Sequence, residues 1–216
     1  MNKEILKQLE MLPFFSIPSL RVIEEINRKA LYQNIERWVG TGAIIRLKNG
    51  LYVTKTYVDR FLHDKSYIEL VANKLASPSY LSLEYVLQKM SLLTEATYPV
   101  TSITLKTTRR FENGLGLFEY RHLHPRLYFG FVQRRFGQNI ICEATPAKAL
   151  FDFLYLQLPR LDVKDPSSLD ELRINWSELD KPSFGELRRI LVKSGVKKLT
   201  ALIPPLEEIY HGNAHQ

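Results

Sequence analysis

Residues 27–53 constrain the fold of this chain most, because three local signals follow one another there without a gap. From residue 28 to residue 39, apolar side chains recur at the spacing of one helical face; they are Leu31, Ile35, Trp38 and Val39. Asn27 is a suitable N-cap, and Gly40 or Gly42 can end the helix. The pattern predicts an amphipathic helix followed at once by a short hairpin.

The solvent face of this predicted helix is basic and carries amides, with Glu36 as its one acid. Its candidate contact residues are Arg28, Lys29, Tyr32, Gln33, Asn34 and Arg37. In the major groove of duplex DNA, Gln and Asn can pair bidentately with adenine, and Arg with guanine. The residue types therefore favour DNA binding, and an ordinary solvated helix face is the alternative interpretation.

The hairpin after the helix allows two registers. A two-residue turn, Asn49-Gly50, would pair Lys48 with Leu51. A three-residue loop over 48–50, with Gly50 at positive φ, would instead pair Leu47 with Leu51.

We prefer the three-residue loop, because it also pairs Ile45 with Val53 and gives one clean apolar face. Arg46 and Tyr52 then lie outside. The candidate contacts on this wing are Arg46, Lys48 and Asn49, which could reach phosphate or the minor groove.

Two shorter helices should precede the stretch, over residues 3–12 and after a Ser16 or Ser19 cap. The segment 55–65 is expected to be a polar, ordered connection. A basic helix and a tight hairpin, preceded by two helices, are typical of a winged helix-turn-helix domain. We assign this domain to residues 1–62.

Residues 63–216 mix both periodicities and predict a second, mixed α/β domain, so the fold class is α+β. Helices are expected at 67–75, 83–90, 145–156 and 183–194, and strands at 100–106, 114–123, 127–132 and 140–144. Ser82 is the expected N-cap of the second helix. Thr145 and Pro146 begin the third in the preferred way.

Charge and composition point to a polyanionic partner inside the cell. The 216 residues carry a net charge of +7, and residues 1–62 alone hold ten Lys/Arg against six Asp/Glu. No apolar run reaches the length of a membrane span, and the N-terminus lacks the apolar core of a signal peptide. With Cys142 as the single cysteine, we expect a cytoplasmic protein without membrane contact.

Candidate chemistry is sparse. A metal-dependent nuclease could draw on Glu95, Glu119 and Glu143 with Lys106 and Lys148, but no Asp/Glu-x-Lys pair lies on a predicted strand. His122 and His124 share one strand face without a supporting cysteine or carboxylate. We therefore expect no catalytic residue, metal or cofactor. A nucleic-acid-processing enzyme and a protein-interaction module are the alternatives to a DNA-binding regulator.

Three segments resemble the AbiEi family of bacterial antitoxins: the hairpin at 42–53, Ser-Pro-Ser-Tyr-Leu-Ser-Leu-Glu-Tyr-Val-Leu at 77–87, and Glu-Ala-Thr-Pro-Ala-Lys-Ala-Leu-Phe-Asp at 143–152. The family often has Pro-Glu-Lys-Ala in the last segment, where this chain has Ala147. The resemblance implies a repressor of its own type IV toxin-antitoxin operon, which binds double-stranded operator DNA. It also implies a nucleotidyltransferase-like toxin whose action the second domain opposes. The second domain need not bind the toxin to do so. Homodimerisation or cooperative assembly on DNA is compatible with that role.

Overall fold

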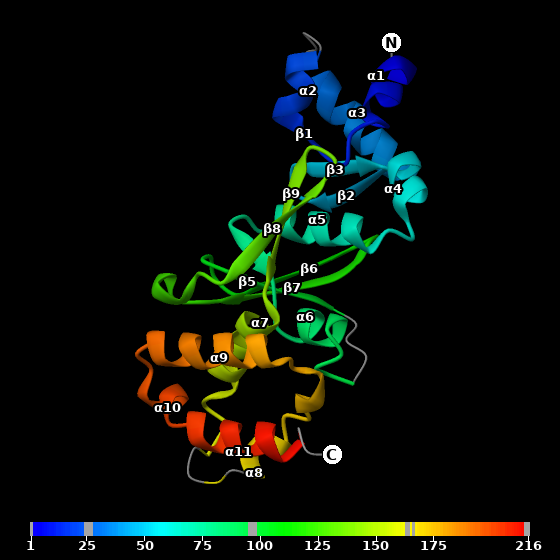
Figure 1. Cartoon of the computed structure of the whole chain (residues 1–216). Coiled ribbons are helices and arrows are strands. Elements are labelled where there is room, and N and C mark those ends of the chain that lie inside the picture. The colour runs from blue at the N-terminus through cyan, green and yellow to red at the C-terminus, as the bar shows by residue number, and fades with distance from the viewer. Residues whose placement is uncertain (1, 24–27, 95–98, 163–164, 166, 214–216) are drawn as a thin grey trace. The chain divides into compact units, whose positions relative to one another are not determined.

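The computed structural model describes residues 2–23, 28–94, 99–162, 165 and 167–213 of the chain, and it has the α+β character that the sequence predicts (Figure 1). The chain forms two compact units. The first consists of Met1–Val71 with Phe111–Leu117, and the second of Ala72–Arg110 with Phe118–Gln216. The functional boundary expected after residue 62 stays a prediction.

The first unit combines helices with a small antiparallel sheet in the order β1-β3-β2. Its elements are α1 (Asn2–Leu9), β1 (Phe15–Ser16), α2 (Ile17–Ile23), α3 (Arg28–Gly40), β2 (Ile44–Lys48), β3 (Leu51–Thr54), α4 (Lys55–Phe61) and most of α5 (Lys65–Leu75). Its core contains Ile5, Leu9, Phe15, Leu20, Leu31, Ile35, Trp38, Ile44 and Tyr52. Ser16 precedes α2, and its backbone N–H bonds to the Ser19 hydroxyl at 2.9 Å.

The segment 55–65, expected as a polar, ordered connection, is mostly the helix α4, which the sequence pattern did not indicate. Thr54 caps this helix by accepting the backbone N–H of Tyr57 at 3.2 Å. Tyr57 is buried and stacks on Phe61, with ring centroids 4.7 Å apart. Two buried residues, Tyr57 and Val58, in a seven-residue helix are too few to give a periodic signal.

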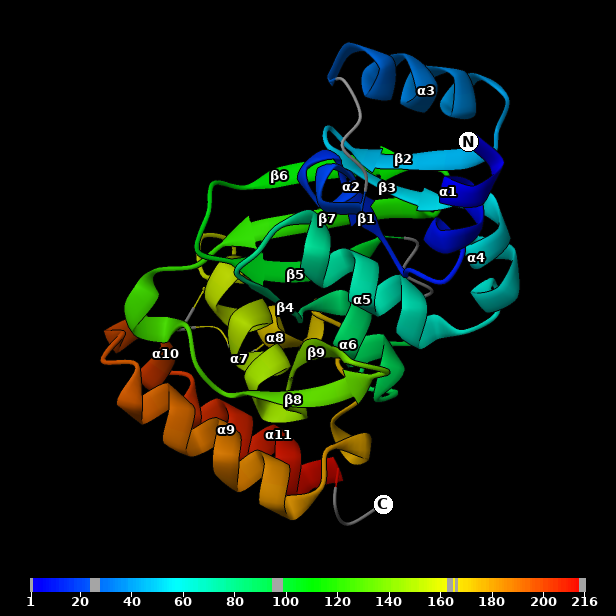
Figure 2. The same cartoon turned by 90° about the horizontal axis from the view of Figure 1, so that it is seen from above.

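The second unit is built on a six-stranded mixed sheet in the order β6-β7-β5-β4-β9-β8, which Figure 2 shows from above. The strands are β4 (Ser79–Leu81), β5 (Val100–Thr104), β6 (Arg109–Asn113), β7 (Gly116–His122), β8 (Phe131–Phe136) and β9 (Asn139–Ala144). Strand β5 runs parallel to β7, and β4 runs parallel to β9, while β8 and β9 form an antiparallel hairpin. The tip between β6 and β7 belongs to the first unit.

The strand expected at 127–132 is wrong in its position. A 3₁₀ turn covers Pro125–Leu127, and β8 begins only at Phe131. The aromatic run between them packs its rings around a buried cluster, where Tyr128 lies 5.0 Å from the Tyr80 ring. An apolar run does not distinguish a paired strand from a packed loop.

Helices fill the rest of the second unit, and Figure 1 shows α6, α7 and α9 on one side of the sheet. They are α6 (Glu84–Lys89), α7 (Pro146–Gln157), α8 (Ser167–Asp170), α9 (Lys181–Lys193), α10 (Lys197–Thr200) and α11 (Ile203–Asn213), with a 3₁₀ turn at Trp176–Glu178. The cap of α7 is confirmed, because Thr145 accepts the Lys148 N–H at 3.2 Å. Among the described residues, no helix has the length and apolar character to span a bilayer.

The expected Ser82 cap of α6 is wrong. Leu83 precedes the helix with φ at 61° and makes no side-chain capping bond, while the Tyr85 N–H in the first turn donates to Thr101 Oγ1 at 3.0 Å. The Ser82 hydroxyl instead donates to Asp152 Oδ2 at 2.8 Å. A carboxylate 70 residues away competes successfully with the local helix terminus, because a hydrogen bond to a buried charge is stronger than a neutral cap.

Asp152 forms a fully buried ion pair with Lys148, one turn before it on α7. Lys148 Nζ also donates to the Leu127 carbonyl at 2.8 Å and lies 4.6 Å from the Phe151 ring centroid. The Tyr80 hydroxyl donates to Asp152 Oδ2 at 2.9 Å. Burial lowers the pKa of Lys148 and raises the pKa of Asp152, and the attraction between the two groups opposes both shifts.

Replacing Lys148 with Met should lower the free energy of unfolding of the second unit by about 3–5 kcal/mol, because it leaves a buried carboxylate without its cation. The chain has two tryptophans, so Trp176 fluorescence in a Trp38→Phe background can follow urea unfolding of this unit. Adding Asp152→Leu to Lys148→Met should recover part of the loss.

The matched control is Lys193→Met, which removes an exposed lysine whose ammonium lies 4.6 Å from the Phe129 ring. It should cost less than about 1 kcal/mol, as exposed charges usually do. Equal losses for the two Lys→Met variants would contradict a special role for the buried pair.

Candidate nucleic-acid interface

Helix α3 presents one polar stripe to solvent, because its opposite face is fixed in the core. Leu31, Ile35 and Trp38 are buried, as the sequence predicts, and Val39 is half-buried. The exposed stripe consists of Lys29, Tyr32, Gln33, Glu36, Arg37 and Gly40. These positions follow the helical repeat at intervals of three and four residues, so they lie along one line of the helix.

Two of the predicted contact residues on α3 are already joined. Arg37 Nη2 donates to Asn34 Oδ1 at 3.1 Å, which orders the guanidinium along the helix surface. Asn34 itself is half-buried, at the border of the stripe. Tyr32 is 40% exposed, so its ring forms part of the surface. Arg28 is the first residue of the helix, but its side chain lies outside the described residues.

The hairpin β2–β3 combines features of both registers that the sequence allowed. Ile45 pairs with Val53, as the preferred register predicts. Lys48, however, pairs with Leu51 around the two-residue turn Asn49-Gly50, so the preferred three-residue loop is wrong there. An irregularity between Arg46 and Lys48 reconciles the two parts of the ladder, in the manner of a β-bulge.

Tyr52 is buried, so the expectation that it lies outside is wrong. Its ring stacks on Phe15 of β1, with centroids 5.9 Å apart. The opposite sheet face is also occupied: Asn113 Nδ2 donates to the Leu47 carbonyl at 3.0 Å. A Cβ on Gly114 would lie 3.3 Å from the Ile45 side chain. Both faces of this hairpin are therefore packed within the first unit, and only its edge and tip remain for a ligand.

Arg46 is tied to α3 rather than free for a ligand. Its Nη2 contacts Glu36 Oε1 at 2.5 Å, and the two side chains are 38% and 64% exposed. The ion pair links the hairpin to Glu36, the only acidic residue of the α3 stripe. It partly neutralises the positive charge of Arg46, which the sequence analysis predicted to contact DNA. Sequence reasoning missed this pair because helix and strand bring the two residues together over ten positions, without a local repeat.

The tip of the hairpin carries the basic and amide side chains that the sequence predicts there. Asn49 is exposed and Lys48 is half-exposed, and Gly50 has φ at 77°, as predicted. With the α3 stripe, the tip gives two adjacent elements that carry cations and amides. Such groups can bind phosphates through Lys and Arg, and base edges through Gln, Asn and Arg.

The residues considered for nuclease chemistry are engaged elsewhere. Glu143 is buried and forms ion pairs with Lys89 at 2.8 Å and Arg134 at 3.3 Å. Lys148 is fully buried in its pair with Asp152, so it is not accessible to a substrate. Glu119 is half-buried on β7 and Lys106 is exposed, while Glu95 lies outside the described residues.

The two histidines considered for a metal make hydrogen bonds inside the protein. His122 Nδ1 lies 3.1 Å from the Lys106 carbonyl oxygen, and His124 Nδ1 accepts the Arg126 N–H at 3.2 Å. In the described ranges, no group of three or more potential metal ligands is present.

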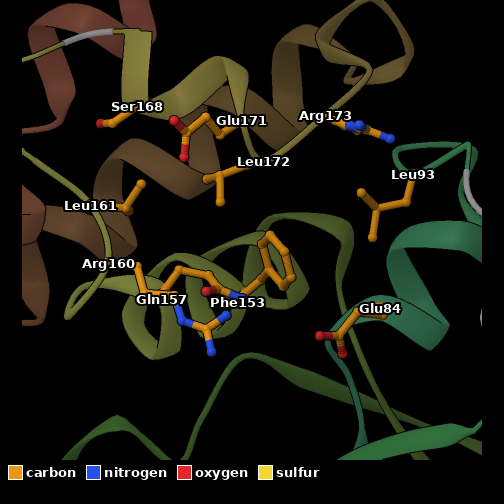
Figure 3. A pocket seen from close by; sticks show the side chains of 10 residues that line it. All are labelled: Glu84, Leu93, Phe153, Gln157, Arg160, Leu161, Ser168, Glu171, Leu172 and Arg173. Carbon is orange, nitrogen blue, oxygen red and sulfur yellow. The ribbon is translucent and has the colours of Figure 1, made fainter.

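An open pocket of about 570 Å³ lies in the second unit (Figure 3). Phe153, Leu161 and Leu172 form an apolar part of its lining. Arg160 and Glu84 add opposite charges. The size suits a small ligand, but the mixed charges favour no particular chemical class. The stripe on α3 is therefore the better candidate site.

The comparisons with known proteins give no further guidance. Neither a scan against protein-family models nor a search of curated proteins finds a match to this chain. The resemblance to AbiEi antitoxins stays a prediction that depends on its three segments.

The turn at Gly50 can be tested through glycine substitutions. Gly50→Ala should destabilise the first unit by about 1–2 kcal/mol, because an L-residue is strained at this positive φ. Gly40→Ala, at the exposed end of α3 with nothing within 4 Å of the new Cβ, should be neutral or stabilising. Urea unfolding, monitored by the fluorescence of Trp38 in a Trp176→Phe background, measures the free energy of unfolding of both variants. If Gly50→Ala leaves the free energy of unfolding unchanged, the positive-φ turn at this position is contradicted.

Proposed function

We propose that the first unit is a winged helix that binds duplex DNA, with α3 as the recognition helix and β2–β3 as the wing. The order of its elements, α1, β1, α2, α3, β2 and β3, supports this assignment, as does the strand order β1-β3-β2. The single observation that carries the proposal is the exposed α3 stripe, in which Lys29, Gln33 and Arg37 recur at four-residue intervals on one face of the helix.

The dimensions and residue types of α3 suit the major groove. Its 13 residues give a length of about 20 Å, enough to follow the groove across several base pairs. Gln33 and Arg37 can read base edges, and Lys29 at the start of the helix can contact phosphate. Lys48 and Asn49 at the hairpin tip can contact the neighbouring backbone or the minor groove.

The wider role that we propose is a cytoplasmic repressor and antitoxin of a type IV toxin-antitoxin operon. It would bind double-stranded operator DNA and oppose a nucleotidyltransferase-like toxin. This role depends on the resemblance to AbiEi antitoxins. Two of the three resembling segments meet in the core, where Tyr80 and Ser82 donate to Asp152. These buried contacts support a shared fold of the second unit.

The variant Arg37→Ala/Lys48→Ala tests the placement of the interface. If both side chains contact phosphate, duplex binding should weaken about tenfold or more, and the slope of log K against log salt should fall by about two. Fluorescence anisotropy of a labelled duplex at several salt concentrations measures both quantities.

The matched control is Lys197→Ala/Lys198→Ala, which removes two exposed positive charges from α10 in the second unit. It should leave the affinity and the salt slope close to those of the wild type. If the two double variants behave alike, the protein attracts DNA through its overall charge, and the α3 interface is refuted.

Glu36→Gln should strengthen duplex binding several-fold, because it removes the one carboxylate of the stripe and releases Arg46. Glu4→Gln, on the exposed surface of α1, makes the same charge change away from the stripe and should have less effect. Anisotropy at low salt compares the two. An equal gain for both variants would assign the effect to net charge alone.

A further inference from the structure

Strand β8 is an edge of the six-stranded sheet, and its free side carries no neighbouring strand among the described residues. Figure 2 shows it as the outermost strand, beyond β9. Its pairing with β9 runs without a register shift from Phe131↔Ala144 to Phe136↔Asn139. An unbroken edge strand offers a row of backbone donors and acceptors with the spacing that another strand requires.

The side chains of β8 leave this edge accessible. Val132 is 53% exposed, and Gln133 and Arg135 are exposed as well. Ile140, the partner of Arg135 on β9, is 49% exposed. Phe131, in contrast, stacks on Tyr80 with ring centroids 4.8 Å apart and anchors the start of the strand. Phe131 therefore fixes the start of the strand, and Val132 leaves one exposed apolar side chain beside its free edge.

The exposed charge on this edge strand is positive. Strand β8 holds Arg134 and Arg135 and no acidic residue, and Glu143, which lies opposite Val132 on β9, is buried. Arg134 is engaged by Glu143 at 3.3 Å. Arg135 is exposed and makes no ion pair within 4 Å among the described residues. A partner at this edge would therefore gain from negative charge.

Two other occupants fit less well. A second copy of β8, paired antiparallel near the strand centre, would bring the Arg134–Arg135 pairs of the two copies close together, which opposes self-pairing. A nucleic acid could neutralise the arginines, but it cannot continue the backbone ladder, and it makes little use of exposed Val132 and Ile140.

We propose that β8 is a docking edge for an acidic, extended segment of another protein, which adds to the sheet as an antiparallel or parallel strand. Backbone hydrogen bonds along β8 supply the register, Arg135 selects negative charge on one face of the added strand, and Val132 contacts apolar side chains on the other face. This interaction is separate from the proposed DNA binding, because it uses a different unit and different residues. Either activity can fail without the other.

The experiment uses the full chain and a capped six-residue peptide of alternating Glu and Val, which matches the length of β8. Hydrogen exchange of the β8 amides is measured with and without saturating peptide. We expect the amides that face the free edge to exchange about tenfold more slowly when the peptide is bound. The same peptide with N-methyl groups on alternate backbone nitrogens keeps its charge but should give no protection.

Arg135→Glu should weaken binding of the Glu-Val peptide at least about tenfold, and Arg135→Lys should retain most of it. Lys197→Glu makes the same charge reversal on exposed α10 and is the matched control. Circular dichroism checks that every variant is folded.

Three results would overturn the proposal. The peptide could fail to protect β8 at saturating millimolar concentration. The N-methylated peptide or a single-stranded oligonucleotide could bind as well as the Glu-Val peptide, which would indicate a surface for any polyanion. The free protein could already be a dimer whose β8 amides are protected, which would assign the edge to a second copy.

Discussion

The buried Lys148–Asp152 pair is the interaction on which the second unit depends. Two opposite charges without solvent are stable only when their remaining hydrogen-bonding groups are satisfied, and here strand β4, helix α7 and the loop before β8 supply the partners. Gly130 passes so close that a Cβ there would lie 3.1 Å from the Lys148 side chain. The same cluster therefore sets the path of the chain into β8 and the position of the exposed edge.

A comparable constraint acts on the first unit, where packing rather than charge determines which face of α3 is exposed. Burial of Leu31, Ile35 and Trp38 fixes the rotation of α3, so the polar stripe faces solvent as a consequence. The hairpin beside it is packed on both faces, which leaves its tip as the exposed part. The Glu36–Arg46 ion pair joins the two elements and partly offsets the positive charge of the exposed stripe.

Local patterns predicted the elements whose partners lie nearby in the chain. The buried stripe of α3, the strand β9 and the Thr145 cap of α7 all follow from short-range spacing, and all are confirmed. The errors at Tyr52, Ser82 and the expected strand at 127–132 share one cause. In each case a partner far away in sequence decides the outcome: Phe15 for Tyr52, Asp152 for Ser82, and Tyr80 for Tyr128. Periodicity contains no information about such partners.

We propose that the first unit binds DNA in a sequence-selective way. The most direct measurement is a gel-shift titration of the full chain against the duplex upstream of its own gene and a scrambled duplex of equal composition, at two salt concentrations. We expect tighter binding to the upstream duplex at both concentrations, with affinities that fall as salt rises. Weak and equal binding to the two duplexes would contradict the claim.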